Sequence, residues 1–217
     1  MESVSVRLFC MIICAVASQT EVYIGSDSIV LPHITPSVIA PSLSVYRRTG
    51  YVIGVCAMPY IVHHIRASFI PPKRNDKLTL ETHMATTFYR EFMSSLTPYR
   101  ENIQALIGSM GKLFYFSHYG VVECVDGYMA IGDAADIALG SLYSTMNMAG
   151  YKRIAVALSA ATKHNHLIRA PYTILSSGLY AVSRYSPDFH SNMTEVDLTA
   201  QKQEQRENAR RYSRKEN

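Results

Sequence analysis

The chain has 217 residues, of which 48% are apolar, and a formal net charge of +4 at pH 7. This length and composition suit one domain with a full hydrophobic core. Residues 201–217 carry six Lys or Arg against three Glu, a net +3, so the remaining chain is nearly neutral. Nucleic-acid binding by the body of the protein is therefore not expected. An uninterrupted apolar run of about 18 residues is absent, which argues against a membrane-spanning helix.

The order of the predicted elements points to layered sheets and helices. Hairpins are expected over 11–17 with 21–25, 45–48 with 51–56, and 104–108 with 112–117. Helices are expected over 58–68, 78–95, 133–148 and 151–164, and further strands over 121–125, 171–176 and 179–185. The proline-containing segment 30–44 is expected to be extended or looped. This order differs from βαβ alternation and favours two sheets sandwiched between helical layers.

The beginning of the chain has a second interpretation. Residues 8–17 are apolar and end in Ala15-Val16-Ala17, a pattern typical of a secretory leader. However, Glu2 spoils the basic segment that such a leader needs. Cleavage after Ala17 would also remove the hairpin partner of residues 21–25. We therefore interpret residues 1–10 as an N-terminal extension and do not expect secretion.

Other reactive side chains form weak patterns. The four cysteines lack metal-site spacing and favour buried, reduced thiols, although a disulfide stays open. They are Cys10, Cys14, Cys56 and Cys124. The pair His164 and His166 has no nearby carboxylate or cysteine, which favours a polar helix end over a metal site. His63 and His64 are adjacent, so one is expected exposed and one packed. The sequence predicts no metal or cofactor.

Five segments in the right order carry a resemblance to the proteasome β subunit and HslV family of N-terminal nucleophile hydrolases. They are Ile12-Ile13-Cys14-Ala15-Val16 with Ile24-Gly25-Ser26-Asp27; Val45-Tyr46-Arg47-Arg48 with Tyr51-Val52-Ile53-Gly54; Ala130-Ile131-Gly132-Asp133; Ala138-Leu139-Gly140-Ser141-Leu142-Tyr143; and Pro171-Tyr172-Thr173-Ile174-Leu175. The chain looks most like the proteasome-like proteins that bacteriophages and some bacteria encode. The resemblance covers about residues 11–176. It implies an α+β fold, a four-layer αββα sandwich, and assembly into rings.

The resemblance also implies a set of catalytic positions. The family uses an N-terminal Thr as nucleophile and its amine as base, an Asp about sixteen residues later, a Lys in the next strand, and a Ser in a Gly-Ser-Gly turn. The Asp is retained as Asp27, but the other positions hold Met11, Ser44 and Asp133. Replacing Lys by Ser and Ser by Asp changes the local charge by about −2, which favours a protonated amine that cannot act as a base. The four residues are therefore predicted to form a vestigial pocket without catalysis.

Alternatives to this interpretation stay open. Cys10 lies one residue before Met11, so a one-residue slip and removal of residues 1–9 would give an N-terminal Cys nucleophile beside Asp27. A buried core cysteine explains the same residue. Asp27 also fits a carboxylate that caps a turn. A third possibility is a regulatory ring subunit that pairs with an active homologue.

The sequence thus predicts a proteasome-like domain over 11–185, preceded by the extension 1–10 and followed by a polar tail over 186–217. The expected function is that of a degenerate hydrolase with a structural or assembly role, in a phage head, neck or tail. Expected partners are further copies of the chain or other virion proteins, with residues 201–217 as a docking segment. The expected location is the virion or the host cytoplasm.

Overall fold

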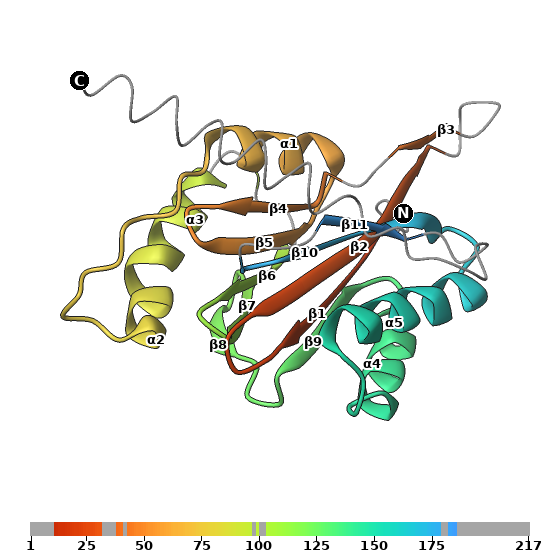
Figure 1. The fold of residues 1–217 in the computed structure, drawn as a ribbon. Coiled ribbons are helices and arrows are strands. Elements are labelled where there is room, and N and C mark those ends of the chain that lie inside the picture. The colour runs from red at the N-terminus through yellow and green to blue at the C-terminus, as the bar shows by residue number, and fades with distance from the viewer. Residues whose placement is uncertain are drawn as a thin grey trace, which may run out of the picture.

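The computed structural model describes residues 11–31, 38–40, 43–96, 99, 103–178 and 182–185, and the side chains within them except at 29–31, 38–40 and 182–185. In this part of the chain, two antiparallel sheets face each other between two helical layers (Figure 1). The predicted four-layer αββα sandwich of the α+β class is confirmed. Cys10 and the tail over 201–217 lie outside the described residues.

One sheet has the strand order β11-β10-β2-β1-β9, with β3 beside the end of β2, and the other has the order β4-β5-β6-β7-β8. The strands of the first sheet are β1 (Ile12–Ala17), β2 (Val22–Leu31), β3 (Val38–Ala40), β9 (Tyr128–Gly132), β10 (Arg169–Ser176) and β11 (Val182–Tyr185). Those of the second are β4 (Val45–Arg48), β5 (Tyr51–Cys56), β6 (Gln104–Ser109), β7 (Lys112–Ser117) and β8 (Gly120–Glu123). The helices are α1 (Pro59–Ser68), α2 (Leu80–His83), α3 (Tyr89–Ser95), α4 (Ala135–Ser144) and α5 (Gly150–His164), and η1 (Met84–Phe88) is a π-helical turn between α2 and α3.

The strand β1 lies at the centre of the packing, because both of its faces are covered. Ile13 and Ala15 belong to the core between the two sheets, whereas Ile12, Cys14 and Val16 belong to the core beneath α4 and α5. Alternate side chains of a strand point to opposite faces, so a continuous apolar run is what such a doubly covered strand needs. The start of β1 is thereby held in place from both sides.

A third core lies between the second sheet and the layer formed by α1, η1 and α3. Aromatic rings from the helical layer pack on the sheet. The ring centroids of Phe88 and Phe92 each lie 5.6 Å from that of Phe116, in edge-to-face geometry. Such pairs contribute more than their buried area alone. α1 lies above β4 and β5, and α4 and α5 lie on the opposite side of the sandwich, below β1 and β9 (Figure 1).

The structure corrects several predicted boundaries. β2 continues to Leu31, beyond the predicted end at residue 25, and β3 pairs with its last residues. The polar run of Ser26 and its neighbours resembles a turn in the sequence, but these residues are buried in the ladder between β1 and β10. β9 was not predicted as a strand. The helix predicted over 133–148 is confined to Ala135–Ser144, where the Thr145 hydroxyl donates to the Ser141 carbonyl.

Candidate functional site

The residues at the start of β1 are brought together by the pairing of three strands. Ile13 pairs with Ser26 of β2, and Ile12 pairs with Gly132 of β9. The Asp133 N–H donates to the Met11 carbonyl at 3.2 Å, and the Ile12 N–H donates to Oδ1 of Asp27 at 3.0 Å. Met11 itself is 4% exposed and packs in the core between the sheets. Met11 and Asp133 are therefore joined by a backbone hydrogen bond, and the Asp27 side chain holds the neighbouring Ile12.

Gly132 makes this close approach possible. Its φ is +102°, and a Cβ at this position would lie 1.9 Å from the Met11 carbonyl oxygen. Only glycine tolerates both the backbone conformation and the contact. The glycine of the Gly132-Asp133 pair, which carried part of the resemblance, is thus required by the close approach of the main chain at Met11. Asp133, the next residue, is exposed to solvent.

Asp27 lies in the interior of β2 and is 1% exposed. It therefore does not cap a turn, and that alternative interpretation was wrong. Burial raises the pKa of its carboxyl to about 7, although hydrogen bonding from the backbone of Ile12 and Arg169 opposes this effect. No Lys or Arg of the described residues forms an ion pair with it. The carboxyl is thus partly protonated near neutral pH.

Ser44 belongs to the facing sheet, directly before β4, and is fully buried. Its carbonyl accepts a hydrogen bond from the Val55 N–H at 2.9 Å. The structure therefore places Ser44 next to the end of β5, and no backbone hydrogen bond joins it to Met11 or Asp27. A hydroxyl there cannot supply the positive charge that the resemblance implies at this position.

Sequence reasoning missed Cys56, which ends β5 on the facing sheet. Burial raises the pKa of its thiol to about 12, and the negative charges of Asp133 and Asp27 raise it further. Cys56 therefore lies close to both carboxylates but stays protonated and weakly nucleophilic. The predicted hairpin could have revealed it. Because β4 and β5 are antiparallel, the last residue of β5, Cys56, lies at the same end of the sandwich as Ser44, which precedes β4.

Within the described ranges, Cys14, Cys56 and Cys124 are free thiols. The four histidines singled out from the sequence form no catalytic or metal cluster. His63 is exposed, and His64 is half-buried against Tyr99, with ring centroids 5.2 Å apart. His164 and His166 are both exposed. Among the described residues, no three His, Cys, Asp or Glu side chains cluster as metal ligands do. Within the same part of the chain, no helix combines the length and apolarity needed to cross a membrane.

Two antiparallel sheets between two helical layers form the proteasome-like sandwich fold that N-terminal nucleophile hydrolases share. Solved structures with this fold match the chain over most of its length. Thiobacillus denitrificans BPH in complex with epoxomicin matches with a TM-score of 0.62 and 14% identity, covering 78% of this chain and 100% of that chain. Anbu, an ancestral β-subunit, from Yersinia bercovieri matches with a TM-score of 0.61 and 13% identity, covering 82% of this chain and 88% of that chain. Eukaryotic HslV from Trypanosoma brucei matches with a TM-score of 0.56 and 14% identity, covering 76% of this chain and 98% of that chain. No protein-family model and no curated protein sequence matches the chain. The likeness therefore concerns the fold.

Proposed function

We propose that this protein is a catalytically degenerate subunit on a proteasome-like scaffold, with a structural or assembly role. It acts by packing against further copies of itself or other proteins, as a component of a phage head, neck or tail. The phage assignment rests on the sequence resemblance. The degenerate pocket rests on the residues at Met11, Ser44 and Asp133.

The start of β1 carries this proposal. The position for the nucleophile holds a thioether, which has no proton to lose and cannot attack a carbonyl. While residues 1–10 remain attached, the Met11 nitrogen is a peptide nitrogen and cannot accept a proton as a free amine does. The Asp27 carboxyl accepts a hydrogen bond from the Ile12 N–H at 3.0 Å. This hydrogen bond thus supports the main chain at the start of β1.

Exposed apolar side chains support a role in packing. Tyr143, Met146 and Met148 follow one another at the end of α4 and are 63%, 55% and 41% exposed. Large exposed apolar groups that gather in one place are typical of interaction surfaces. They belong to the helical layer formed by α4 and α5. Among the structures with the same fold, the Yersinia protein is described as a β-subunit, which agrees with assembly.

Incubation with epoxomicin, the compound bound in the Thiobacillus structure, tests the catalytic half of the proposal. The intact mass of the purified full chain is measured before and after incubation. We expect a mass that includes residues 1–10 and no covalent or tight adduct, because the pocket lacks a nucleophile. A chain that begins at residue 10, or an adduct lost in Asp27→Ala, would overturn the proposal.

Native mass spectrometry tests the assembly half. The full chain is compared with a variant lacking residues 201–217 and with the double variant Tyr143→Ser/Met146→Ser. We expect the full chain to be oligomeric and both variants to shift toward monomer. Ile70→Ser removes a comparably exposed apolar side chain in the loop after α1, 71% exposed, and serves as the control. A monomeric full chain, or variants that assemble like it, would contradict a packing role.

One observation favours a second candidate, an active peptidase or amidohydrolase that uses Cys10 after removal of residues 1–9. The carboxyl of Asp27 is buried beside the start of β1 with a pKa of about 7, a range suited to proton transfer. This candidate requires a free amine at residue 10. N-terminal sequencing of protein isolated from its native source and hydrolysis assays on Cys10→Ser separate it from the first candidate.

A further inference from the structure

A cleft of about 550 Å³ opens at the end of the sandwich opposite Met11. Its walls come from the turn between β4 and β5, the turn between β6 and β7, and the loop that leads from α1 to α2. Gly111 of the second turn packs against the backbone of Gln19, which follows the far end of β1. The cleft is therefore separate from the pocket at the start of β1. Its volume lies within the range of small-molecule sites, about 300–1,000 Å³.

Two residues that line the cleft hold a backbone conformation that their side chains disfavour. Thr49 has φ 47° and Met110 has φ 51°, and these are the positive values outside glycine in the described part of the chain. Each is the first residue of a two-residue hairpin turn, followed by Gly50 and Gly111. Such turns favour Asn or Gly at this position, so a β-branched Thr and a Met are unfavourable choices for folding. Strained residues of this kind cluster at ligand sites.

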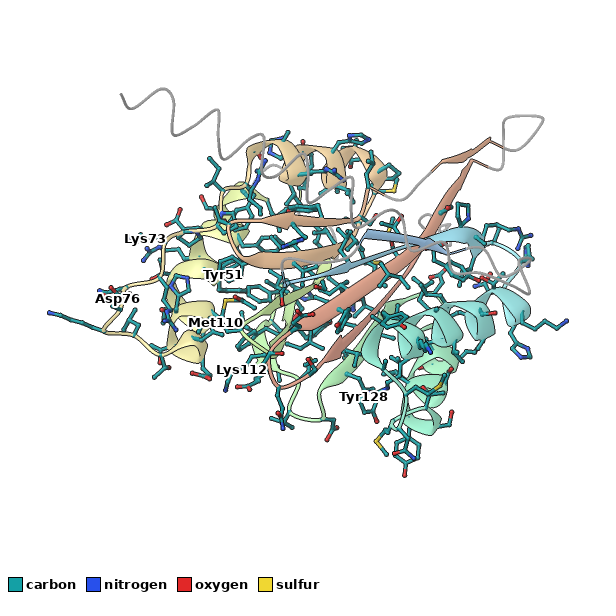
Figure 2. All side chains as sticks on the ribbon, in the orientation of Figure 1. Tyr51, Lys73, Asp76, Met110, Lys112 and Tyr128 are labelled. Atoms are coloured by element: carbon teal, nitrogen blue, oxygen red, sulfur yellow. The ribbon has the colours of Figure 1, made fainter. Side chains whose placement is uncertain are left out.

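The two turns form one wall, because the Ser109 hydroxyl donates to the Gly50 carbonyl at 3.2 Å. The Met110 side chain is 63% exposed at its rim. Leu80, Pro71 and the buried ring of Tyr51 add further apolar surface to the cleft. Figure 2 shows Tyr51, Lys73 and Met110 at this side of the molecule. The cleft thus offers an apolar surface with an exposed, flexible Met side chain at its rim.

The charges at the cleft are unbalanced. Lys73 and Arg74 line it, and neither forms an ion pair within the described residues. The nearby carboxylates are already engaged: Lys112 binds Glu81, and it binds Glu123 at 3.1 Å. Asp76, further along the same loop, forms no ion pair with either cation. Burial raises the pKa of Tyr51 and the charge of Arg74 opposes this, so the guanidinium lies near the phenol within the cleft.

We propose that this cleft binds a small organic phosphate, with the phosphate at Lys73 and Arg74 and an apolar body against Pro71, Leu80 and Met110. Two adjacent cations balance a dianionic phosphate, whereas a carboxylate would leave one positive charge unpaired. A guanidinium also matches phosphate oxygens with two parallel hydrogen bonds. This site goes beyond the proposed structural role and does not depend on it.

A titration with 1-naphthyl phosphate tests the proposal on the full chain. Methionine methyl groups are labelled with ¹³C, and the Met110 resonance is assigned with Met110→Leu. We expect saturable shifts of the Met110 methyl at low salt, weakened by added salt because exposed charges are screened. Inorganic phosphate, which lacks the apolar body, and 1-naphthoate, which lacks the second charge, are expected to bind more weakly.

Charge-matched variants locate the phosphate. Arg74→Gln is expected to weaken binding about tenfold or more, and Lys73→Gln somewhat less. Arg90→Gln removes the same charge from an exposed side chain on α3 and is expected to bind as the unmodified protein does. Thermal unfolding of each variant shows that it is folded. An unmoved Met110 methyl, equal affinity in Arg74→Gln, equal loss in Arg90→Gln, or tighter binding of 1-naphthoate would overturn the proposal.

Discussion

The two ends of the sandwich differ in the burial and the hydrogen bonding of their charged groups. At the Met11 end, the Asp27 carboxyl is buried and receives main-chain hydrogen bonds, with no cation paired to it among the described residues. At the cleft end, Lys73 and Arg74 stand beside turns whose backbone is strained at Thr49 and Met110. One end therefore holds a buried carboxyl against the main chain. The other has two cations that form no ion pair within the described part of the chain.

This difference separates the end that strand pairing explains from the end that it does not. The Met11 end is explained by strand pairing, one glycine and one carboxyl that accepts a main-chain N–H. Each of these features serves the chain itself. At the cleft end, residues at two turns contradict the local backbone preference without a visible gain in packing. Such conflicts between local preference and the folded structure are expected at functional sites.

The largest expected effect comes from Gly132→Ala, which tests whether the Met11 end is fixed by main-chain geometry. The added Cβ would meet the Met11 carbonyl oxygen at 1.9 Å in a residue with φ +102°. We expect a loss of about 4 kcal/mol or more in the free energy of unfolding, measured by urea denaturation. Gly140→Ala in α4, where no atom lies within 4 Å of the new Cβ, is the control and should stabilise by about 0.5–1 kcal/mol. Similar stabilities of the two variants would contradict this account.

A smaller effect is expected from Asp27→Asn, which tests whether the buried carboxyl costs stability. Its pKa is raised from 3.8 to about 7 in the folded protein, so the folded state holds a proton that the unfolded chain releases. Stability should therefore fall as the pH rises from about 4 to 7 and then level off. The penalty is at most about 4 kcal/mol, and we expect Asn to recover about 2 kcal/mol at pH 8 while it keeps the acceptor for Ile12 N–H.

Urea unfolding at pH 5 and pH 8 measures this effect. The difference in stability between the two pH values should shrink in Asp27→Asn. Asp126→Asn, at an exposed position between β8 and β9, removes a carboxyl without removing a buried one and should leave the difference unchanged. Equal pH dependence in Asp27→Asn and the unmodified chain would show that Asp27 is ionised in the fold at both pH values.

Thr49→Asn tests the strain at the cleft end. Asn adopts a positive φ more readily than Thr, and the first residue of this turn has φ 47°. We expect a gain of about 1 kcal/mol in the free energy of unfolding. The β-branched Thr is replaced without touching Lys73 or Arg74, so the phosphate should still bind, more weakly if the methyl of Thr49 contacts its apolar body. A loss of stability would show that Thr49 has a packing role at this turn.

Much of the fold was predictable because its strands and helices carry strong apolar patterns. The hairpin of β4 and β5 was predicted with its observed ends, since Thr49-Gly50 marks the turn and β5 is a continuous, buried apolar run. β9 was missed because it is short, follows Gly127 and ends at Gly132, and both glycines suggest turns. Its strand conformation comes from pairing with β1, a long-range contact that local patterns do not contain.

The pocket was predictable in part and the cleft was not. Asp27 and Gly132 were found through the motifs around them, and their contacts with Ile12 and Met11 explain those motifs. Cys56 was missed because it belongs to the facing sheet and meets the carboxylates across the sandwich. The cleft unites residues from two turns and a loop between helices, about 60 residues apart in the chain at Gly50 and Ser109. Only the packing of the sheets places them together.

The smallest effect is expected from Met11→Thr, and it separates a degenerate pocket from one that merely lacks its nucleophile. In the full chain, the nitrogen of residue 11 is a peptide nitrogen, so the new hydroxyl has no adjacent amine to act as base. Ser44 also provides no positive charge to lower the hydroxyl pKa, and Asp27 is itself partly protonated. We therefore expect no hydrolysis of a fluorogenic peptide panel above the level of Met11→Ala, even with residues 1–10 removed by an engineered protease site. Turnover by Met11→Thr that disappears in Met11→Thr/Asp27→Ala would show that the pocket keeps its catalytic electrostatics, and the comparison between the two ends would then have to be abandoned.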